Sequence, residues 1–257
     1  METADSIFEF ELKKRGMVAS RTADGLYEFQ IDDRRITVSL ENVRRDYDRD
    51  RNSRAVVEFV DQATRDFFTE APTWNDVRGF VRFCLEPSAY EIGFEGVIRD
   101  TVTDGLCRVY VFTPPDGSRI TWIDESMLPH WQVTRADLVR QADENMAAIV
   151  AATKLECEQI DGVKLGMLST TETPFKASLV LSPAFRQLVS ASHGWPVYVV
   201  TPCRDFVYVI STANRDFLGR VGRVVVNEYR KSGHPITKDV LEVGDHGIRA
   251  IGTFPDP

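Results

Sequence analysis

A cysteine, an arginine and an aspartate follow one another at Cys203, Arg204 and Asp205, between two apolar segments. A thiolate is a nucleophile, and a neighbouring guanidinium favours the thiolate over the thiol. Cys203 is therefore a candidate nucleophile, with Arg204 and Asp205 as candidate binding residues. The alternative is structural, because Pro202 and Asp205 are typical turn residues and the arginine can pair locally. We favour the structural interpretation, since the sequence indicates no histidine partner for the thiol.

A second candidate site is His193, which follows Ser190 and Ser192. A serine, a histidine and an acid could assemble a hydrolase site in space. However, the chain contains no G-x-S-x-G motif, which marks the nucleophile of many such enzymes. His193 also precedes Gly194 at the expected end of a helix, where a partly cationic imidazole interacts favourably with the helix dipole. We favour this simpler role.

Cysteines and histidines are spread along the chain without the spacing of a metal or redox site. No two cysteines have C-x-x-C spacing, and each histidine stands alone, including the one in the turn-like Asp245-His246-Gly247. A metal site needs several converging ligands. We therefore expect no metal and no cofactor, and thiols that stay reduced and mostly buried. The cysteines are Cys84, Cys107, Cys157 and Cys203.

A basic stripe follows one side of the last long helix that the sequence predicts. Arg220, Arg223, Asn227 and Lys231 recur at three- and four-residue spacing, opposite an apolar stripe. In an acidic protein, such a stripe could bind an acidic partner or a phosphate-bearing ligand. A plain solvated helix face is the alternative and the simpler explanation. The glycines of the segment LGRVG lie inside the helix, so we expect close packing there and no phosphate loop.

Strong local signals predict the elements around these residues in the C-terminal half. Thr134 and Asp137 have capping-box spacing ahead of an apolar stripe, while Ser182, Pro183 and Gly194 delimit a short helix. The two apolar segments around the Cys203 turn are close enough in sequence to pair as an antiparallel hairpin. The expected helices cover residues 135–150, 183–194 and 215–231, and the expected strands cover 155–160, 163–168, 176–181, 196–201, 206–211, 238–243 and 247–252.

The N-terminal half has mainly the alternating pattern of strands. Residues 6–12 and 16–21 alternate apolar and polar side chains, and two strand-like segments follow at 26–31 and 35–40. We expect these four segments to form a small antiparallel sheet. Apolar residues then recur at helical spacing from Val56, which predicts a helix that ends near Glu70.

The middle of the chain leaves one assignment open. Thr73 and Asp76 resemble a capping box, which favours a helix over residues 74–85, with a buried strand over 81–85 as the alternative. From residue 91 to 123 the pattern is typical of two hairpins, with turns at Asp104-Gly105 and at residues 114–117.

Composition excludes several classes of function. The 257 residues carry a net charge of −8, with 43% hydrophobic and 27% charged residues, as in an ordinary globular protein. A negative surface repels nucleic acid. No apolar run approaches the roughly 20 residues that span a bilayer, and the first residues do not resemble a signal peptide. We therefore expect a cytoplasmic protein that binds neither nucleic acid nor membranes.

Two short motifs in the C-terminal half are shared with a known group of proteins. Ala142 and Asn145 form an Ala-x-x-Asn pattern in a helix, and Pro202, Arg204 and Asp205 form Pro-x-Arg-Asp between two strands. In both motifs the chain resembles the YtpQ-like bacterial family, over roughly residues 119–250. The resemblance implies an intracellular, bacterial-type α+β domain. The family has no established activity, so it supplies no catalytic residues.

Together these observations predict an α+β protein of antiparallel sheets, with helices packed mainly on one face. We expect two closely packed halves, residues 1–128 and 129–257, with the boundary inside Asp124–Gln132. The expected function is non-enzymatic binding of another protein inside the cell. The alternative is a small-molecule hydrolase with a site around Cys203 or His193. The candidate binding residues are Arg204, Asp205, Arg220, Arg223 and Lys231.

Overall fold

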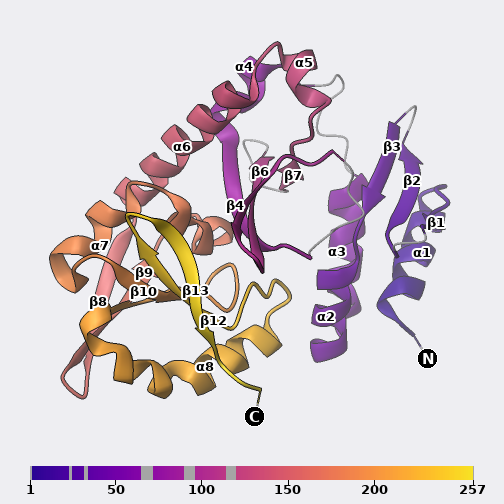
Figure 1. The fold of residues 1–257 in the computed structure, drawn as a ribbon. Coiled ribbons are helices and arrows are strands. Elements are labelled where there is room, and N and C mark those ends of the chain that lie inside the picture. Colours follow the sequence, from indigo (N-terminus) through magenta and orange to yellow (C-terminus); the bar gives the residue numbers. More distant parts are fainter. Residues whose placement is uncertain are drawn as a thin grey trace. The chain divides into compact units, whose positions relative to one another are not determined.

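A computed structural model of the chain describes residues 2–22, 25–31, 34–64, 72–89, 96–113 and 120–256 (Figure 1). These residues form two compact units, the first mainly from Met1–Ala71 and the second mainly from the chain after residue 71. Both units combine helices with antiparallel sheets, so the expected α+β class is confirmed. None of the described helices is both long and apolar enough to cross a membrane.

The first unit packs three helices against a small antiparallel sheet, whose strand order is β1-β2-β3. Phe8 from the first helix lies at the centre of its core, with its ring centroid 5.0 Å from that of Tyr27 and 6.2 Å from that of Phe29. The elements are α1 (Ala4–Lys14), β1 (Ser20–Arg21), β2 (Tyr27–Ile31), β3 (Arg34–Val38), α2 (Glu41–Asp50) and α3 (Ser53–Thr64).

The strand expected over residues 6–12 is wrong, because this segment lies within helix α1. The Thr3 hydroxyl accepts a hydrogen bond from the Ser6 amide at 3.1 Å, and the Ser6 hydroxyl accepts one from the Thr3 amide at 2.9 Å. This reciprocal cap starts a helix whose buried Phe8 and Leu12 are one turn apart. Helical capping and spacing therefore outweigh the short alternation. The expected helix end near Glu70 lies outside the described residues.

A carboxylate network ties three elements of the first unit together. The Arg44 guanidinium of α2 donates to both oxygens of Asp5 in α1, with Nε–Oδ2 at 2.9 Å and Nη2–Oδ1 at 2.7 Å. The Tyr27 hydroxyl of β2 donates to Asp5 Oδ1 at 2.8 Å. These hydrogen bonds, chiefly that from Arg44, lower the pKa of Asp5 to about 2.

The second unit begins with a four-stranded sheet of order β4-β6-β5, with β7 paired to β6. Helix α6 covers one face of this sheet, and Asn145 Nδ2 holds it there by donating to the carbonyls of Arg78 at 2.7 Å and Val81 at 2.8 Å. The elements are α4 (Trp74–Val77), the 3-10 helix η1 (Arg78–Phe80), β4 (Val81–Pro87), β5 (Arg99–Thr103), β6 (Leu106–Phe112), β7 (Thr121–Trp122), α5 (Met127–Trp131) and α6 (Arg135–Ala152).

Two expectations for this region are resolved. The capping box at Thr73 and Asp76 is present, but its helix ends after one turn and the alternative strand continues as β4. Four successive residues of β4, 83–86, are buried, so both sides of this segment are covered. A strand can be covered on both sides, whereas a helix at the surface keeps one side exposed to solvent. Asp104 and Gly105 form the β5–β6 turn as expected, whereas the turn at residues 114–117 lies outside the described residues.

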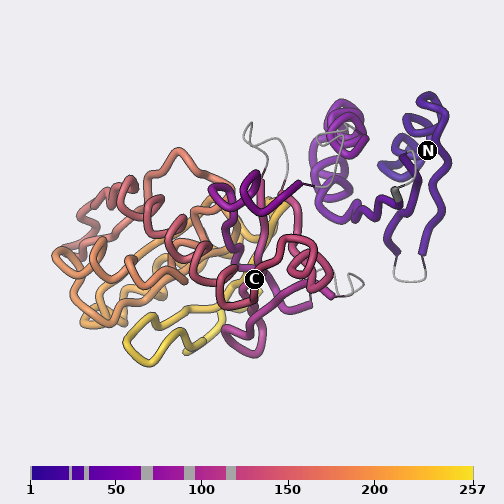
Figure 2. Tube along the Cα trace, turned by 90° about the horizontal axis from the view of Figure 1, so that it is seen from above, coloured from indigo at the N-terminus to yellow at the C-terminus, as the bar shows by residue number. Residues whose placement is uncertain are grey.

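The second unit continues with a six-stranded antiparallel sheet of order β13-β12-β10-β11-β9-β8, whose trace is seen from above in Figure 2. Its central strand β10 is buried at all four residues, because α7 and α8 cover opposite faces of the sheet. The elements are β8 (Lys154–Ile160), β9 (Val163–Ser169), the 3-10 helices η2 (Thr173–Phe175) and η3 (Ala177–Leu181), α7 (Phe185–His193), β10 (Val197–Val200), β11 (Tyr208–Ser211), the 3-10 helix η4 (Thr212–Phe217), α8 (Leu218–Lys231), β12 (Asp239–Gly244) and β13 (Gly247–Thr253).

The strand expected over residues 176–181 is wrong, because this segment is the 3-10 helix η3. All five η3 residues are buried, so the run of apolar side chains carries no strand-like alternation. The Ser178 hydroxyl of η3 accepts a hydrogen bond from the Leu85 amide at 2.9 Å. A serine side chain, and not the backbone of a further strand, therefore accepts the hydrogen bond from this β4 amide.

The compact units are not divided at the expected boundary. Residues on both sides of 128 belong to the second unit, and α6 from one side packs on β4 from the other. The division between the units falls at Ala71 and Pro72.

The variant Asp5→Asn tests the carboxylate network of the first unit. Because the folded pKa of Asp5 is about 2 and lies below the roughly 3.9 of an unfolded aspartate, its stabilisation is full above the unfolded value and is lost as the pH falls through about 2. The variant should lower the urea midpoint of the first unit near pH 7 and lower it much less near pH 2, as measured on the NMR signals of Tyr27. Asp48→Asn, which removes an exposed ion pair with Arg51, is the control and should change little. An Asp5 effect of equal size at both pH values would contradict this explanation.

Candidate functional site

The turn between β10 and β11 points its arginine into the protein. The two strands pair antiparallel as expected, with Val200 opposite Tyr208. Arg204 Nε and Nη2 both donate to Glu86 Oε1 of β4, at 3.1 Å and 2.6 Å. The Glu86 side chain is 4% exposed and that of Arg204 is 16% exposed. The arginine therefore forms a buried ion pair with a residue 118 positions away, and the expected local pairing is wrong.

Backbone hydrogen bonds surround this ion pair and fix the turn in place. The Ala177 amide of η3 donates to the Arg204 carbonyl at 2.9 Å, and the Ile236 amide donates to the Pro202 carbonyl at 2.8 Å. Burial raises the pKa of Glu86, and the Arg204 guanidinium opposes this shift by stabilising the carboxylate. We call Glu86, Arg204 and these hydrogen bonds the junction, because they connect the four-stranded sheet to the six-stranded sheet.

Cys203 does not have the surroundings of a catalytic nucleophile. Its side chain is buried, with 2% exposure, so Sγ is shielded from an external substrate. The thiol lies 3.1 Å from Asp205 Oδ1 and donates to that carboxylate. Asp205 itself is exposed at the outer end of the turn.

His193 ends helix α7 as expected, but its ring is buried against β9. Nδ1 lies 2.8 Å from the Ser192 hydroxyl, and a side chain on Gly166 would place Cβ only 2.8 Å from the ring carbon Cε1. Burial lowers the pKa of His193, which disfavours the cationic imidazole expected at the end of this helix. His193 is 4% exposed, so its ring is shielded from an external substrate, whereas Ser192 is half-buried.

Side-chain hydrogen bonds also hold the turn of Asp245 and His246 in place. Asp245 Oδ1 accepts hydrogen bonds from Arg186 Nη1 at 2.8 Å and from Trp195 Nε1 at 2.9 Å. Within the part of the chain that the structure describes, no three His, Cys, Asp or Glu side chains are arranged to hold a metal ion.

The structure also reveals a polar cluster that sequence reasoning missed. On the α6 face of the four-stranded sheet, Tyr110 donates to Asp100 Oδ2 at 2.7 Å, and Arg135 Nη2 donates to Asp100 Oδ1 at 2.6 Å. Nearby, Arg108 Nη1 lies 4.0 Å from Asp143 Oδ1. Burial raises the pKa of Asp143. Only the strand register that sets Asp100 beside Arg108 brings these residues together, so no local sequence signal identifies them.

The basic residues of α8 lie on its solvent side as the spacing predicts. Arg220, Arg223, Asn227 and Lys231 are all exposed, and Val224 between them is 41% exposed. Arg220 forms an ion pair with Asp161 of the β8–β9 turn. For Arg223, no carboxylate lies within ion-pair distance among the described residues. This side of α8 therefore combines an apolar side chain with an unneutralised guanidinium.

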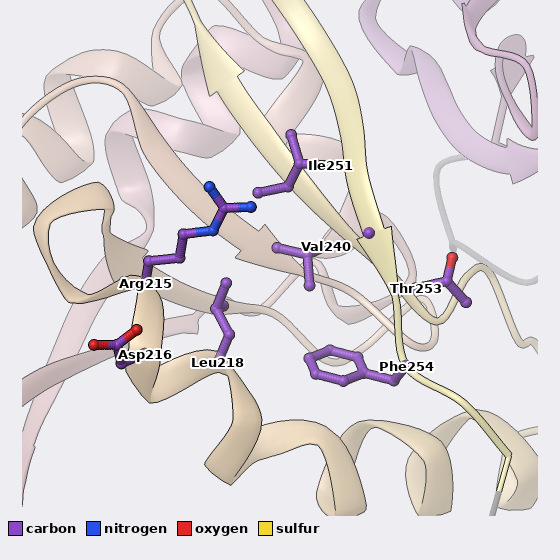
Figure 3. Close-up of a pocket in the computed structure, with 8 residues that line it drawn as sticks. Arg215, Asp216, Leu218, Val240, Ile251, Thr253 and Phe254 are labelled. Carbon is purple, nitrogen blue, oxygen red and sulfur yellow. The ribbon is translucent and has the colours of Figure 1, made fainter.

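A cavity of about 330 Å³ opens beside the start of α8 (Figure 3). Apolar side chains of α8, β12 and the β13 region form much of its lining, and Arg215 of η4 extends over them. Its residues come from segments that are distant in sequence, which is why sequence reasoning missed the cavity. The lining residues are Arg215, Asp216, Leu218, Val240, Ile251, Gly252, Thr253 and Phe254.

Comparisons with known proteins do not identify the chain. No protein-family model, no curated protein and no solved structure matches it. The resemblance to the YtpQ-like family stays a prediction.

Removal of the arginine tests the junction. Arg204→Ala leaves the Glu86 carboxylate buried without its cation, so the free energy of unfolding should fall by about 3–5 kcal/mol. The double variant Glu86→Leu with Arg204→Leu removes both charges and should lose less. Unfolding is followed by tryptophan fluorescence, because all four tryptophans lie after residue 71.

The matched control is Arg249→Ala in the same unit, which removes an ion pair between the exposed Arg249 and the half-buried Glu242. This loss should stay below about 1 kcal/mol. Equal losses for Arg204→Ala and Arg249→Ala would show that the junction is no stronger than a surface pair.

Proposed function

We propose that this chain is a non-enzymatic binding protein that recognises another protein through the outer side of α8. The proposed surface consists of Arg220, Arg223, Val224 and Asn227, which we call the α8 face. Lys231 is exposed too, but it belongs to the first compact unit and is not part of this surface. A partner of matching chemistry offers a carboxylate to the Arg223 guanidinium and an apolar side chain to Val224, while Arg220 is paired with Asp161.

The observation that carries the proposal is the pairing of Arg223 with Val224. Exposed large apolar side chains are few among the described residues, and in the second unit Val224 is the one that is more than 40% exposed. Arginine beside an apolar contact is typical of protein–protein interfaces, whereas charge alone is typical of any solvated helix. The chain as a whole carries a net charge of −8, so most of its surface repels an acidic partner. The local positive patch therefore orients such a partner on the α8 face.

The other candidate residues support the proposal less. Arg204 is engaged in the junction, so we leave it out of the recognition surface, and Asp205 offers a single exposed carboxylate. We do not advance the hydrolase alternative, because Cys203 and His193 are both buried. We place the binding event in the cytoplasm, because the exposed Cys157 thiol forms no disulfide, which suits a reducing compartment.

A photo-crosslinking residue in place of Val224 tests this proposal in the source cells. We expect one discrete covalent adduct with another protein, identified by mass spectrometry. Arg223→Glu in the same chain should lower its yield about tenfold, because charge reversal repels an acidic partner. The yield should also fall as salt is raised.

Two controls use the exposed strand β8 of the same unit. A photo-crosslinking residue at Gln159 should give no comparable adduct, and Lys154→Glu should leave the Val224 adduct unchanged. The proposal fails if the Val224 position gives no adduct beyond that of Gln159, or if Arg223→Glu has no effect.

A further inference from the structure

The cavity beside α8 has the size of a small ligand site. Its volume is about 330 Å³. Ligand sites in proteins range from about 300 to 1,000 Å³. The cavity therefore has room for a molecule of about ten non-hydrogen atoms.

The floor of the cavity is apolar and is held by the core of the second unit. Val240 and Phe254 are buried, and Leu218 and Ile251 pack against the same cluster. Gly222 of α8 permits this arrangement, because a Cβ at that position would lie 2.8 Å from Phe254 Cδ1. The close packing expected for a glycine of the LGRVG segment is confirmed at Gly222. The floor thus exists before any ligand arrives.

One positive charge lies over this floor. Figure 3 shows the Arg215 guanidinium extending toward Ile251, above the apolar side chains, while Asp216 is turned away from them. Among the residues that the structure describes, Arg215 has no carboxylate within ion-pair distance. Arg215 is exposed, so its guanidinium is accessible to an anion, and hydrogen bonds between a guanidinium and a carboxylate are strengthened by their charges.

We propose that this cavity binds a small apolar carboxylate. The carboxylate accepts paired hydrogen bonds from the Arg215 guanidinium, and the apolar group lies on Leu218, Val240 and Phe254. A neutral molecule leaves the guanidinium without an anion, and a polyanion places surplus charge on the apolar floor. The site does not depend on the α8 face, since none of its lining residues belongs to that surface.

The probe is 4-fluorophenylacetate, observed by fluorine NMR with the full-length chain. We expect saturable binding with a Kd of about 1 mM, a typical affinity for about ten non-hydrogen atoms. The neutral analogue 4-fluorophenylacetamide should bind at least about tenfold more weakly, because it lacks the charge-assisted hydrogen bonds. Arg215→Gln should weaken binding of the carboxylate about tenfold and leave binding of the amide unchanged.

Two further variants separate this site from general surface binding. Arg223→Gln removes an exposed arginine of α8 that does not line the cavity, and it should change the Kd less than about twofold. Ile251→Trp fills the cavity and should abolish binding, and Leu218→Phe serves this purpose if the first variant does not fold. The proposal is overturned if the probe does not bind saturably, or if binding survives both Arg215→Gln and a folded cavity-filling variant.

Discussion

The second unit depends on the placement of one buried carboxylate. Glu86 lies in β4 opposite Cys107 of β6, and Cys84 shares its face of the strand. These side chains are buried, and burial raises the pKa of the Cys84 thiol to about 12 and also raises that of Cys107. A carboxylate in such surroundings requires a cation, and the guanidinium of Arg204 provides it.

The position of the β10–β11 turn follows from this requirement. Arg204 has to reach β4, so its hairpin is directed at the four-stranded sheet, and η3 joins the same place through Ala177 and Ser178. Cys203 and Arg204, which are candidates for chemistry from the sequence alone, therefore make structural contacts. The surface that we propose for binding and the cavity both lie beside α8.

Sequence patterns predict the elements whose signals are local. The capping box at Thr134, the β10–β11 hairpin and the solvent side of α8 are all confirmed, because capping, short loops and helical spacing act within a few residues. For residues 6–12 and 176–181 the pattern predicts strands wrongly, because a short apolar run fits the period of a strand and that of a helix. The junction and the cavity have no such signal. Glu86 and Arg204 are separated by 118 positions, and Arg215 meets Ile251 only after the sheet has formed.

Native-state hydrogen exchange at two backbone amides tests the role of the junction most directly. The Leu85 amide donates to Ser178, and the Ala177 amide donates to the Arg204 carbonyl, so both report on the structure around the ion pair. If the second unit depends on the junction, both amides exchange only by global unfolding of that unit, with the same free energy as its most protected strand amides in β10. Exchange of Leu85 and Ala177 through local opening, while the amides of β10 stay protected, would contradict the account.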